Sequence, residues 1–257
     1  MRSVRLVAVA WSLQLKMRSR SAFDGLLSLL WPAFFATTIF MMFRQGGASG
    51  PALLSAAVGS SAMGIWSAVS TTAAFALQME RRQGTLELFV LAPQPFALLL
   101  VPLTLSMATI GAYSMVATLL WGRFAFGIHI SIADPLGFVV AVVVTVFAIG
   151  MLGMLIAISS IRYRSAWALG SAIEMPVWLI CGFLVAIDDL PAWVRPLSAV
   201  LAPTWGVSAM RAAAAGHSPW ADLGRCVLAA AAYGAIATVV SRWMVRSARA
   251  HATLALS

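Results

Sequence analysis

The sequence predicts an all-α membrane protein that forms a single domain over residues 1–257. Its residues are 61% hydrophobic and only 10% charged, and the mean hydropathy is +0.93, whereas soluble domains carry about 25% charged residues. The apolar residues form continuous runs rather than alternating segments of about ten residues, which favours helices over a β-barrel.

Six apolar stretches have the length that a membrane-spanning helix needs. A hydrocarbon core of about 30 Å takes about 20 residues at a rise of about 1.5 Å each. The predicted spans are Phe23–Phe43, Leu53–Leu77, Phe96–Trp121, Pro135–Ile161, Trp167–Ile187 and Leu223–Val245.

Residues 1–20 predict an amphipathic helix that lies in the membrane interface. At about 100° per residue, the basic side chains share one stripe and apolar side chains occupy the other, although Gln14 and Arg18 interrupt the apolar side. The stripe holds Arg2, Arg5, Lys16 and Arg20, opposite Val4, Val7, Trp11 and Leu15. We expect the bases to meet lipid phosphates; the alternative is a frayed cationic terminus.

The basic residues predict the orientation of the chain. Twelve of the 17 Lys and Arg residues fall on the side of the two termini, and five fall on the other, namely Arg44, Arg123, Arg195, Arg211 and Arg225. By the positive-inside rule, we expect both termini and the Glu80 segment to be cytoplasmic. We expect the protein to lie in the inner membrane. The net charge of +9 therefore reflects topology and attraction to anionic membrane lipids rather than nucleic-acid binding.

Residues 79–93, between the second and third spans, predict a short cytoplasmic helix that docks to a partner. Gly84 ends the preceding helix, Thr85 caps the next one and Pro93 stops it. The other docking residues are Glu80, Arg81, Leu86, Glu87 and Phe89. So short a helix is not stable alone in water, and its apolar face needs a groove. The alternative is a solvated loop with ordinary flanking charges.

Residues 188–216 predict a half-buried helical hairpin on the outer side. Asp188, Asp189 and Pro191 have the character of a helix start, Pro203 breaks the run, and a second helix follows from Thr204 to Ala215. Each piece is about half a bilayer long. Trp193, Trp205 and Trp220 suit the headgroup region.

Glu174 is the one acidic residue deep inside a predicted span, and burying a lone carboxylate there is costly. We expect it to border the substrate pathway, where Pro176 weakens its helix. Equally open is a structural hydrogen bond to Ser or Thr of a neighbouring helix. Further pathway candidates are Thr37, Thr38, Ser70 and Thr71, although such hydroxyls often bond to carbonyls of their own helix.

Two stretches resemble the ABC-2 permeases, the membrane subunits of type 2 (type V exporter-like) ABC exporters of drugs, antibiotics and polysaccharides. The family's Glu-Arg-x-x-Gly-Thr-Leu-Glu motif matches Glu80, Arg81, Gly84, Thr85, Leu86 and Glu87, and runs on to Ala92 and Pro93, with alanine where serine or threonine is usual. The second stretch comprises Leu190–Trp193, Leu201–Thr204 and Ala209–Arg211, with Ala202 where the family often has asparagine.

The resemblance implies a half-transporter, in which two permeases, identical or different, stand on two copies of an ABC ATPase subunit. Residues 79–93 would then be the coupling helix. The chain lacks a P-loop, since its only lysine is Lys16, so we expect ATP and Mg on the partner subunit and no cofactor on this chain. The expected cargo is an amphipathic small molecule, natural product or lipid-like molecule. The alternatives are a lipid-linked polysaccharide and, outside this class, an ion-coupled carrier that uses Glu174.

An enzymatic function finds little support in the sequence. Gly59-Ser60-Ser61-Ala62 faintly resembles a serine site, but no histidine lies within a predicted span to activate it. His129, His217 and His251 are too dispersed to form a ligand set, and no metal site is predicted. Cys181 and Cys226 are expected to be buried thiols, with a chance disulfide as the alternative.

Overall fold

The computed structural model describes residues 2–18, 22–48, 50–82, 84, 96–160, 166–185, 187 and 190–251. Within these ranges the elements are helical and no strand occurs, which confirms the predicted fold class. The helices are α1 (Arg2–Arg18), α2 (Ala22–Gln45), α3 (Gly50–Arg82), α5 (Phe96–Phe126), α6 (Pro135–Ser160), α7 (Ala166–Ile180), α8 (Arg195–Val200), α9 (Ala202–Ala214) and α10 (Trp220–His251).

Four of these helices are long and apolar enough to cross a membrane. Their spans are Gly50–Ser70, Leu98–Phe126, Pro135–Ile158 and Trp220–Trp243. They correspond to the second, third, fourth and sixth predicted spans. The first and fifth predicted spans fall on α2 and α7, and the total of six stays a prediction.

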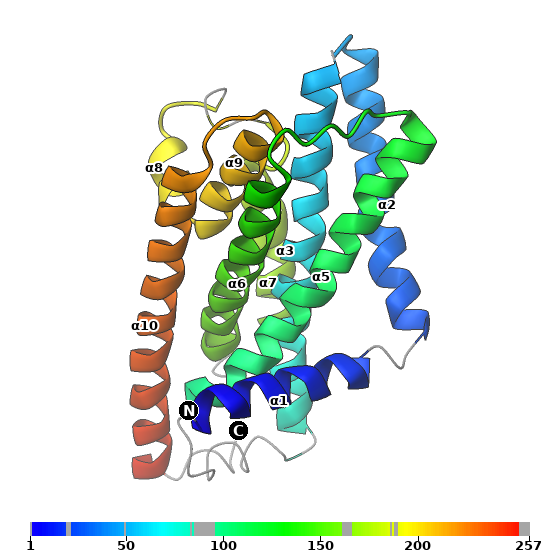
Figure 1. Cartoon of the computed structure of the whole chain (residues 1–257). Coiled ribbons are helices and arrows are strands. Elements are labelled where there is room, and N and C mark those ends of the chain that lie inside the picture. Colours follow the sequence, from blue (N-terminus) through cyan, green and yellow to red (C-terminus); the bar gives the residue numbers. More distant parts are fainter. Residues whose placement is uncertain are drawn as a thin grey trace.

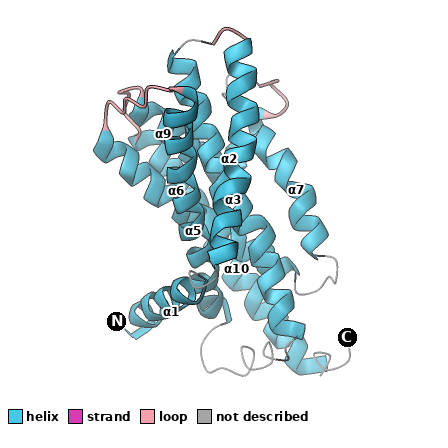
Figure 2. Ribbon diagram, turned by 90° about the vertical axis from the view of Figure 1, so that its right-hand side faces the viewer, coloured by secondary structure: helices cyan, strands magenta, loops and turns pink. Residues whose placement is uncertain are grey.

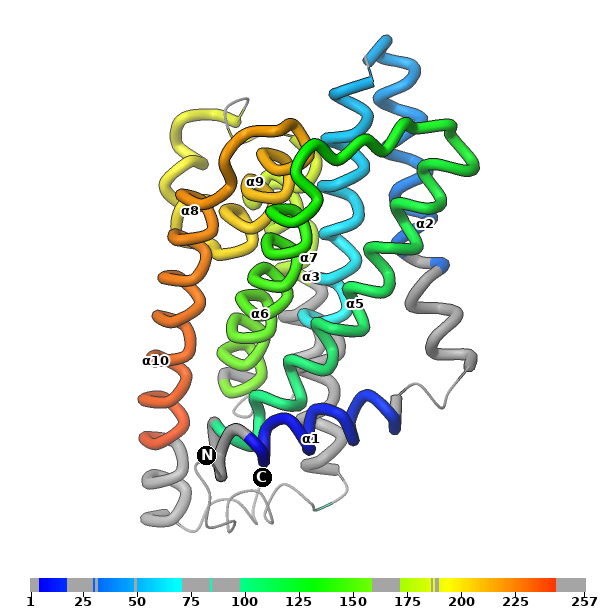
Figure 3. Tube along the Cα trace, in the orientation of Figure 1, coloured from blue at the N-terminus to red at the C-terminus, as the bar shows by residue number. Residues whose placement is uncertain are grey.

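The helices form an elongated bundle with two distinct ends (Figure 1). Helix α1 lies across one end, which the last residues of α10 also reach, and we call it the α1 end. The opposite end carries α8, α9 and the loop of residues 127–134, and we call it the hairpin end (Figure 3). Helix α7 lies at one side of the bundle (Figure 2) and packs mainly against α3.

The core lies where α3, α5, α6 and α9 meet. Trp66, Ile149, Phe183 and Met210 are among its fully buried large side chains. At the α1 end, Trp11 Nε1 of α1 donates a hydrogen bond to Thr109 Oγ1 of α5 over 3.2 Å. Helix α1 therefore packs on the bundle through the tryptophan that the sequence places on its apolar side. Its predicted contact with lipid phosphates stays a prediction.

Local capping chemistry fixes the hairpin end. Asp134 Oδ1 accepts a hydrogen bond from the Gly137 amide at 2.9 Å, which caps the start of α6 with Pro135 in its first turn. The amides of Ala133 and Asp134 donate to Ala214 and Ala213 carbonyls at the end of α9. The loop that precedes α6 is thereby joined to α9.

The fifth predicted span is too long at its end. Helix α7 stops at Ile180 rather than continuing to Ile187. The chain turns at Gly182, which adopts a φ of 73°, a left-handed conformation that glycine takes without strain. The carbonyls of Gly182 and Phe183 accept bonds from Arg211 instead of continuing a helical ladder.

Two helices, α8 and α9, lie within the region predicted to form the outer hairpin, but their starts differ from the prediction. The half-buried position of this region on the outer side stays a prediction. Helix α8 begins at Arg195, not near Pro191, because the Val194 amide donates to the Pro191 carbonyl and closes a turn there. Pro203 does not end the first helix. The break falls at Leu201, whose backbone is extended, and Pro203 occupies the first turn of α9, where proline is well tolerated. Asp188 and Asp189 lie outside the described residues.

Candidate functional site

The predicted coupling segment is described only at its beginning. Glu80 and Arg81 fall in the last turn of α3, and Gly84 follows with an exposed backbone and a φ of 71°. The conformation at Gly84 shows that the chain turns directly after α3. Thr85, Leu86, Glu87, Phe89 and Pro93 lie outside the described residues, so the docking helix stays a prediction.

Glu174 on α7 contacts α3 through a hydrogen bond in which the Ser67 hydroxyl donates to Glu174 Oε1. The Glu174 side chain is half-buried, and its chain neighbours Ile173 and Met175 are exposed to 41% and 59%. The carboxylate therefore lies at the edge of the α3–α7 contact, where it is hydrogen-bonded to α3 and partly exposed. Ser67 is a serine on a neighbouring helix, as the structural alternative for Glu174 predicted.

Ser67 was missed by the sequence reasoning, which singled out Ser70 and Thr71 on the same helix. Ser70 lies one helical turn further along α3, is fully buried, and its Oγ has no hydrogen-bond partner in the described part of the chain. The backbone of Thr71 continues α3, but its side chain lies outside the description. Ser67 and Ser70 share a helix face at a spacing of three residues, and this spacing was the available signal.

The two threonines of α2 form hydrogen bonds to carbonyls of their own helix, which was the alternative to a role in the substrate pathway. Thr37 and Thr38 donate to the carbonyls of Ala33 and Phe34, four residues earlier, over 2.8 and 3.4 Å. Thr37 Oγ1 also accepts a bond from Trp121 Nε1 of α5 at 2.9 Å. Thr37 therefore joins α2 to α5, and Thr38 is the more exposed of the two.

Pro176 lies inside α7, two residues after Glu174, and is exposed. Its ring removes one amide donor from the helix ladder. One turn after Glu174, the Trp178 ring meets the Phe35 ring of α2 edge to face at 5.1 Å. Glu174 and Pro176 thus occupy an α7 segment that α3 contacts on one side and α2 contacts through this aromatic pair.

Arg211 of α9 is the main polar contact of the hairpin end. Its guanidinium donates to three backbone carbonyls: Nε to Ser55 at 3.3 Å, Nη1 to Gly182 at 2.6 Å and Nη2 to Phe183 at 3.0 Å. One side chain therefore joins α9, α3 and the turn after α7.

Gly59 permits this arrangement on the α3 side. A Cβ atom at that position would lie 1.8 Å from the Phe183 carbonyl oxygen and 2.6 Å from Arg211 Nη2. The turn after α7 consequently rests directly on the α3 backbone. Any larger residue would displace both partners.

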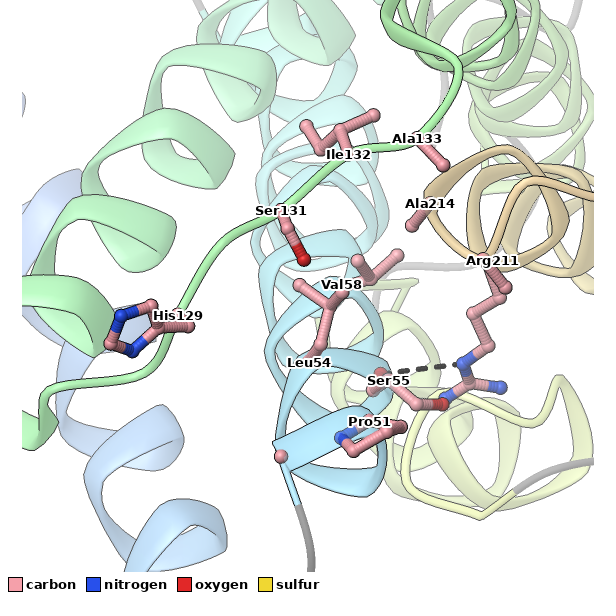
Figure 4. Close-up of a pocket in the computed structure, with 12 residues that line it drawn as sticks. Pro51, Leu54, Ser55, Val58, His129, Ser131, Ile132, Ala133, Arg211 and Ala214 are labelled. Carbon is pink, nitrogen blue, oxygen red and sulfur yellow. Dashed lines mark hydrogen bonds between the residues drawn. The ribbon is translucent and has the colours of Figure 1, made fainter.

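Two clefts open at the hairpin end, and Arg211 lines both. The first, of about 670 Å³, lies between the start of α3, the 128–133 segment and the end of α9 (Figure 4). The second, of about 720 Å³, lies between α8, α9 and the start of α10. In the second cleft Arg225 pairs with Asp222 at 3.0 Å, and the Ser208 hydroxyl donates to the same carboxylate at 2.6 Å.

The described residues form no group of His, Cys, Asp or Glu side chains that would hold a metal ion. Cys181 and Cys226 are both buried and both free thiols, as the default reading of the sequence predicted.

Together these features define a multi-pass helical membrane protein with a half-buried polar contact between α3 and α7, and with α8 and α9 joined to neighbouring elements at one end. The family model for the ABC-2 type transporter matches residues 5–214, and the chain belongs to this family. A comparison with curated proteins gave no match. Members of the family are transport permeases that work with ABC ATPases, so an ABC ATPase is the general kind of partner for this chain.

Proposed function

We propose that this chain is the permease subunit of an ATP-driven exporter that carries an amphipathic small molecule, natural product or lipid-like molecule out of the cytoplasm. Two copies of the ATPase subunit bind ATP and Mg, and a second permease, a copy of this chain or a related one, completes the transporter. The protein lies in the inner membrane with both termini in the cytoplasm. The observation that carries the proposal is the family match together with the Glu80–Pro93 motif, which begins in the last turn of the long helix α3.

In this proposal, nucleotide-driven closure of the ATPases pushes on residues 85–93 and moves the lower part of α3. Each nucleotide state must favour one arrangement of the helices through different contacts at that junction. Helix α3 transmits the movement to α7 through the Ser67–Glu174 bond. Glu174, Pro176, Thr37, Thr38, Ser70 and Thr71 border the pathway in this account.

The orientation is tested by labelling single cysteines with a membrane-impermeant maleimide in intact cells. Both native cysteines are fully buried, which keeps the background low. We expect Gly84→Cys to be labelled only after the cells are opened. We expect His129→Cys, at an exposed position of the 127–134 loop, to be labelled in intact cells. Labelling of Gly84→Cys from outside would overturn the proposed orientation.

The transport function is tested with the permease and its ATPase reconstituted together in vesicles. We expect a panel of amphipathic dyes and antibiotics to include at least one compound that moves only when ATP and Mg are supplied on the ATPase side. Glycan-linked lipids form the second arm of the panel and test the polysaccharide alternative. Transport by the permease alone, without ATP, would contradict the proposal.

The second candidate function is an ion-coupled carrier, which the position of Glu174 favours. A half-buried intramembrane carboxylate is a typical proton-carrying group. This carrier would move its cargo under a pH gradient in the absence of the ATPase, and Glu174→Gln would abolish that movement. The exporter predicts no cargo movement under the same gradient.

A further inference from the structure

Arg211 carries a positive charge that no carboxylate contacts within the described residues. Its three hydrogen bonds all go to neutral carbonyl oxygens. Burial lowers the pKa of the Arg211 guanidinium to about 10, so it remains protonated at neutral pH. Arg225, by contrast, is exposed and forms an ion pair with Asp222. The more buried of the two cations is therefore the one that has no acidic partner among the described residues.

The bonding capacity of Arg211 is not exhausted by the three carbonyls. A guanidinium has five N–H donors, and the described bonds use three of them. The carbonyl oxygens supply only partial negative charge, whereas a buried cation is stabilised most by a hydrogen-bonded anion. The structure thus presents a charge and spare donors at the wall of a cleft.

The first cleft fits a molecule with an apolar part and an anionic group. Most of its wall is apolar, with side chains of Pro51, Leu54, Val58, Ile132 and Ala214. No acidic side chain occurs among its described lining residues, and Arg211 is the charged one. Figure 4 shows Arg211 reaching toward Ser55 at one side, while Ser131 points toward Val58 in the middle.

The position and size of the cleft indicate a membrane lipid. It lies at the hairpin end, which faces the outer leaflet in the proposed orientation, and its rim residues Gly50, Pro51, His129 and Ser131 are exposed. Its volume of about 670 Å³ is that of a small-molecule pocket. It accommodates a headgroup and the adjoining part of an acyl chain, while the remaining chain stays in the bilayer.

We propose that this cleft binds an anionic phospholipid of the outer leaflet, with the lipid phosphate facing Arg211 and the apolar wall holding the first part of an acyl chain. The lipid completes the hydrogen bonding of the side chain that joins α9, α3 and the turn after α7. The hairpin end is therefore stabilised by a component of the membrane. The assignment of the lipid to the outer leaflet rests on the proposed function, whereas the binding site itself does not.

The test uses the full chain in nanodiscs with photoactivatable phosphatidylglycerol or phosphatidylcholine, each carrying a diazirine on the acyl chain. Labelled peptides are mapped by mass spectrometry. We expect the phosphatidylglycerol probe to label residues 50–58 and 128–133 about tenfold more than the phosphatidylcholine probe. Both lipids carry a phosphate, but the choline cation of phosphatidylcholine neutralises its headgroup and is repelled by Arg211, whereas phosphatidylglycerol is anionic. Unlabelled phosphatidylglycerol should compete.

Two pairs of variants localise the site. Ser131→Trp fills the cleft and should abolish labelling of these peptides, whereas Ser131→Ala leaves the cleft open and should preserve it. Arg211→Gln should remove the preference for phosphatidylglycerol, and Arg211→Lys should retain part of it. Because Arg211 also fastens three elements, size-exclusion chromatography checks each variant, and the Ser131 pair decides the matter if Arg211→Gln does not fold.

Equal labelling by the two probes would overturn the proposal. Unchanged labelling of Ser131→Trp would overturn it as well. Neither readout requires the ATPase or transport. A failure here is therefore distinguishable from a failure of the exporter function.

Discussion

The Ser67 hydroxyl on α3 donates a hydrogen bond to the Glu174 carboxylate on α7. This bond directly links α3, whose last turn begins the Glu80–Pro93 segment, to α7, which carries Glu174. The sequence left a structural and a functional role open for Glu174. This hydrogen bond agrees with the structural role and does not test the functional one. Separating them requires variants that remove the bond and the charge independently.

Glu174→Ala should reduce ATP-dependent export at least about tenfold, because the proposed transmission of movement from α3 to α7 needs this bond. The protein should still fold and assemble. Export per folded protein is measured in vesicles. Ile173→Ala, at an exposed neighbouring position, is the control. Ser67→Ala removes the bond but keeps the charge. Normal export by a well-folded Glu174→Ala protein would leave Glu174 with a structural role only.

Gly59→Ala should lower the yield and thermal stability of the protein, because the new Cβ would collide with the Phe183 carbonyl at 1.8 Å. Backbone clashes of this kind cost about 1–3 kcal/mol or more. The matched control is Gly224→Ala in α10, where nothing lies within 4 Å of the new atom and helix propensity rises. Unfolding is followed by size-exclusion chromatography after heating. Equal midpoints for the two variants would contradict the described packing.

Gly84→Val should uncouple ATP hydrolysis from export. The φ of 71° at Gly84 strains a β-branched residue, although no atom lies within 4 Å of a Cβ there, and the penalty is about 1–2 kcal/mol. Gly84→Asn serves as the control because asparagine tolerates left-handed backbone. The ratio of cargo moved to ATP hydrolysed is compared for the two variants. The same ratio in both would show that the turn conformation is irrelevant to coupling.

Tyr233→Phe should loosen the hairpin from α10. The Tyr233 hydroxyl donates to the Val200 carbonyl and accepts from the Ala202 amide, so its removal should cost about 1–3 kcal/mol. Tyr113→Phe is the control, since Tyr113 is 64% exposed. Proteolysis near residues 195–205 in detergent measures the opening of the hairpin. Protection equal to that of the control would contradict the fastening role.

The sequence predicted the helices well where a long apolar run alone decides the structure. The fourth span was expected over Pro135–Ile161 and α6 covers Pro135–Ser160, because Asp134 and Pro135 mark its start locally. The end of α7 was missed because the apolar run continues to Ile187. Gly182 was a local signal for the turn, but the bonds from Arg211 to the carbonyls of Gly182 and Phe183 come from a distant part of the chain. No local pattern contains such a contact.

In the candidate site, too, the sequence predicted what depends on a single residue and missed what depends on how the helices pack. The cost of burying Glu174 predicted that it needs a partner, but the partner's identity depends on the relative register of α3 and α7. Ser67 could not be chosen over Ser70 without that register. Likewise, the exposed charge pattern identified Arg211 as an outer base, whereas its three carbonyl partners and the two clefts beside it arise only from packing.

The bond between Trp11 and Thr109 gives the first helix a practical use. The bond joins α1 to α5, so α1 should move together with α5, which carries the third predicted span. A fluorophore on the exposed side of α1, for example at Lys16, would therefore report displacement of α5. A second dye on α10 would convert that displacement into an energy-transfer signal. The transport cycle of the working complex then becomes observable in real time, without a known cargo.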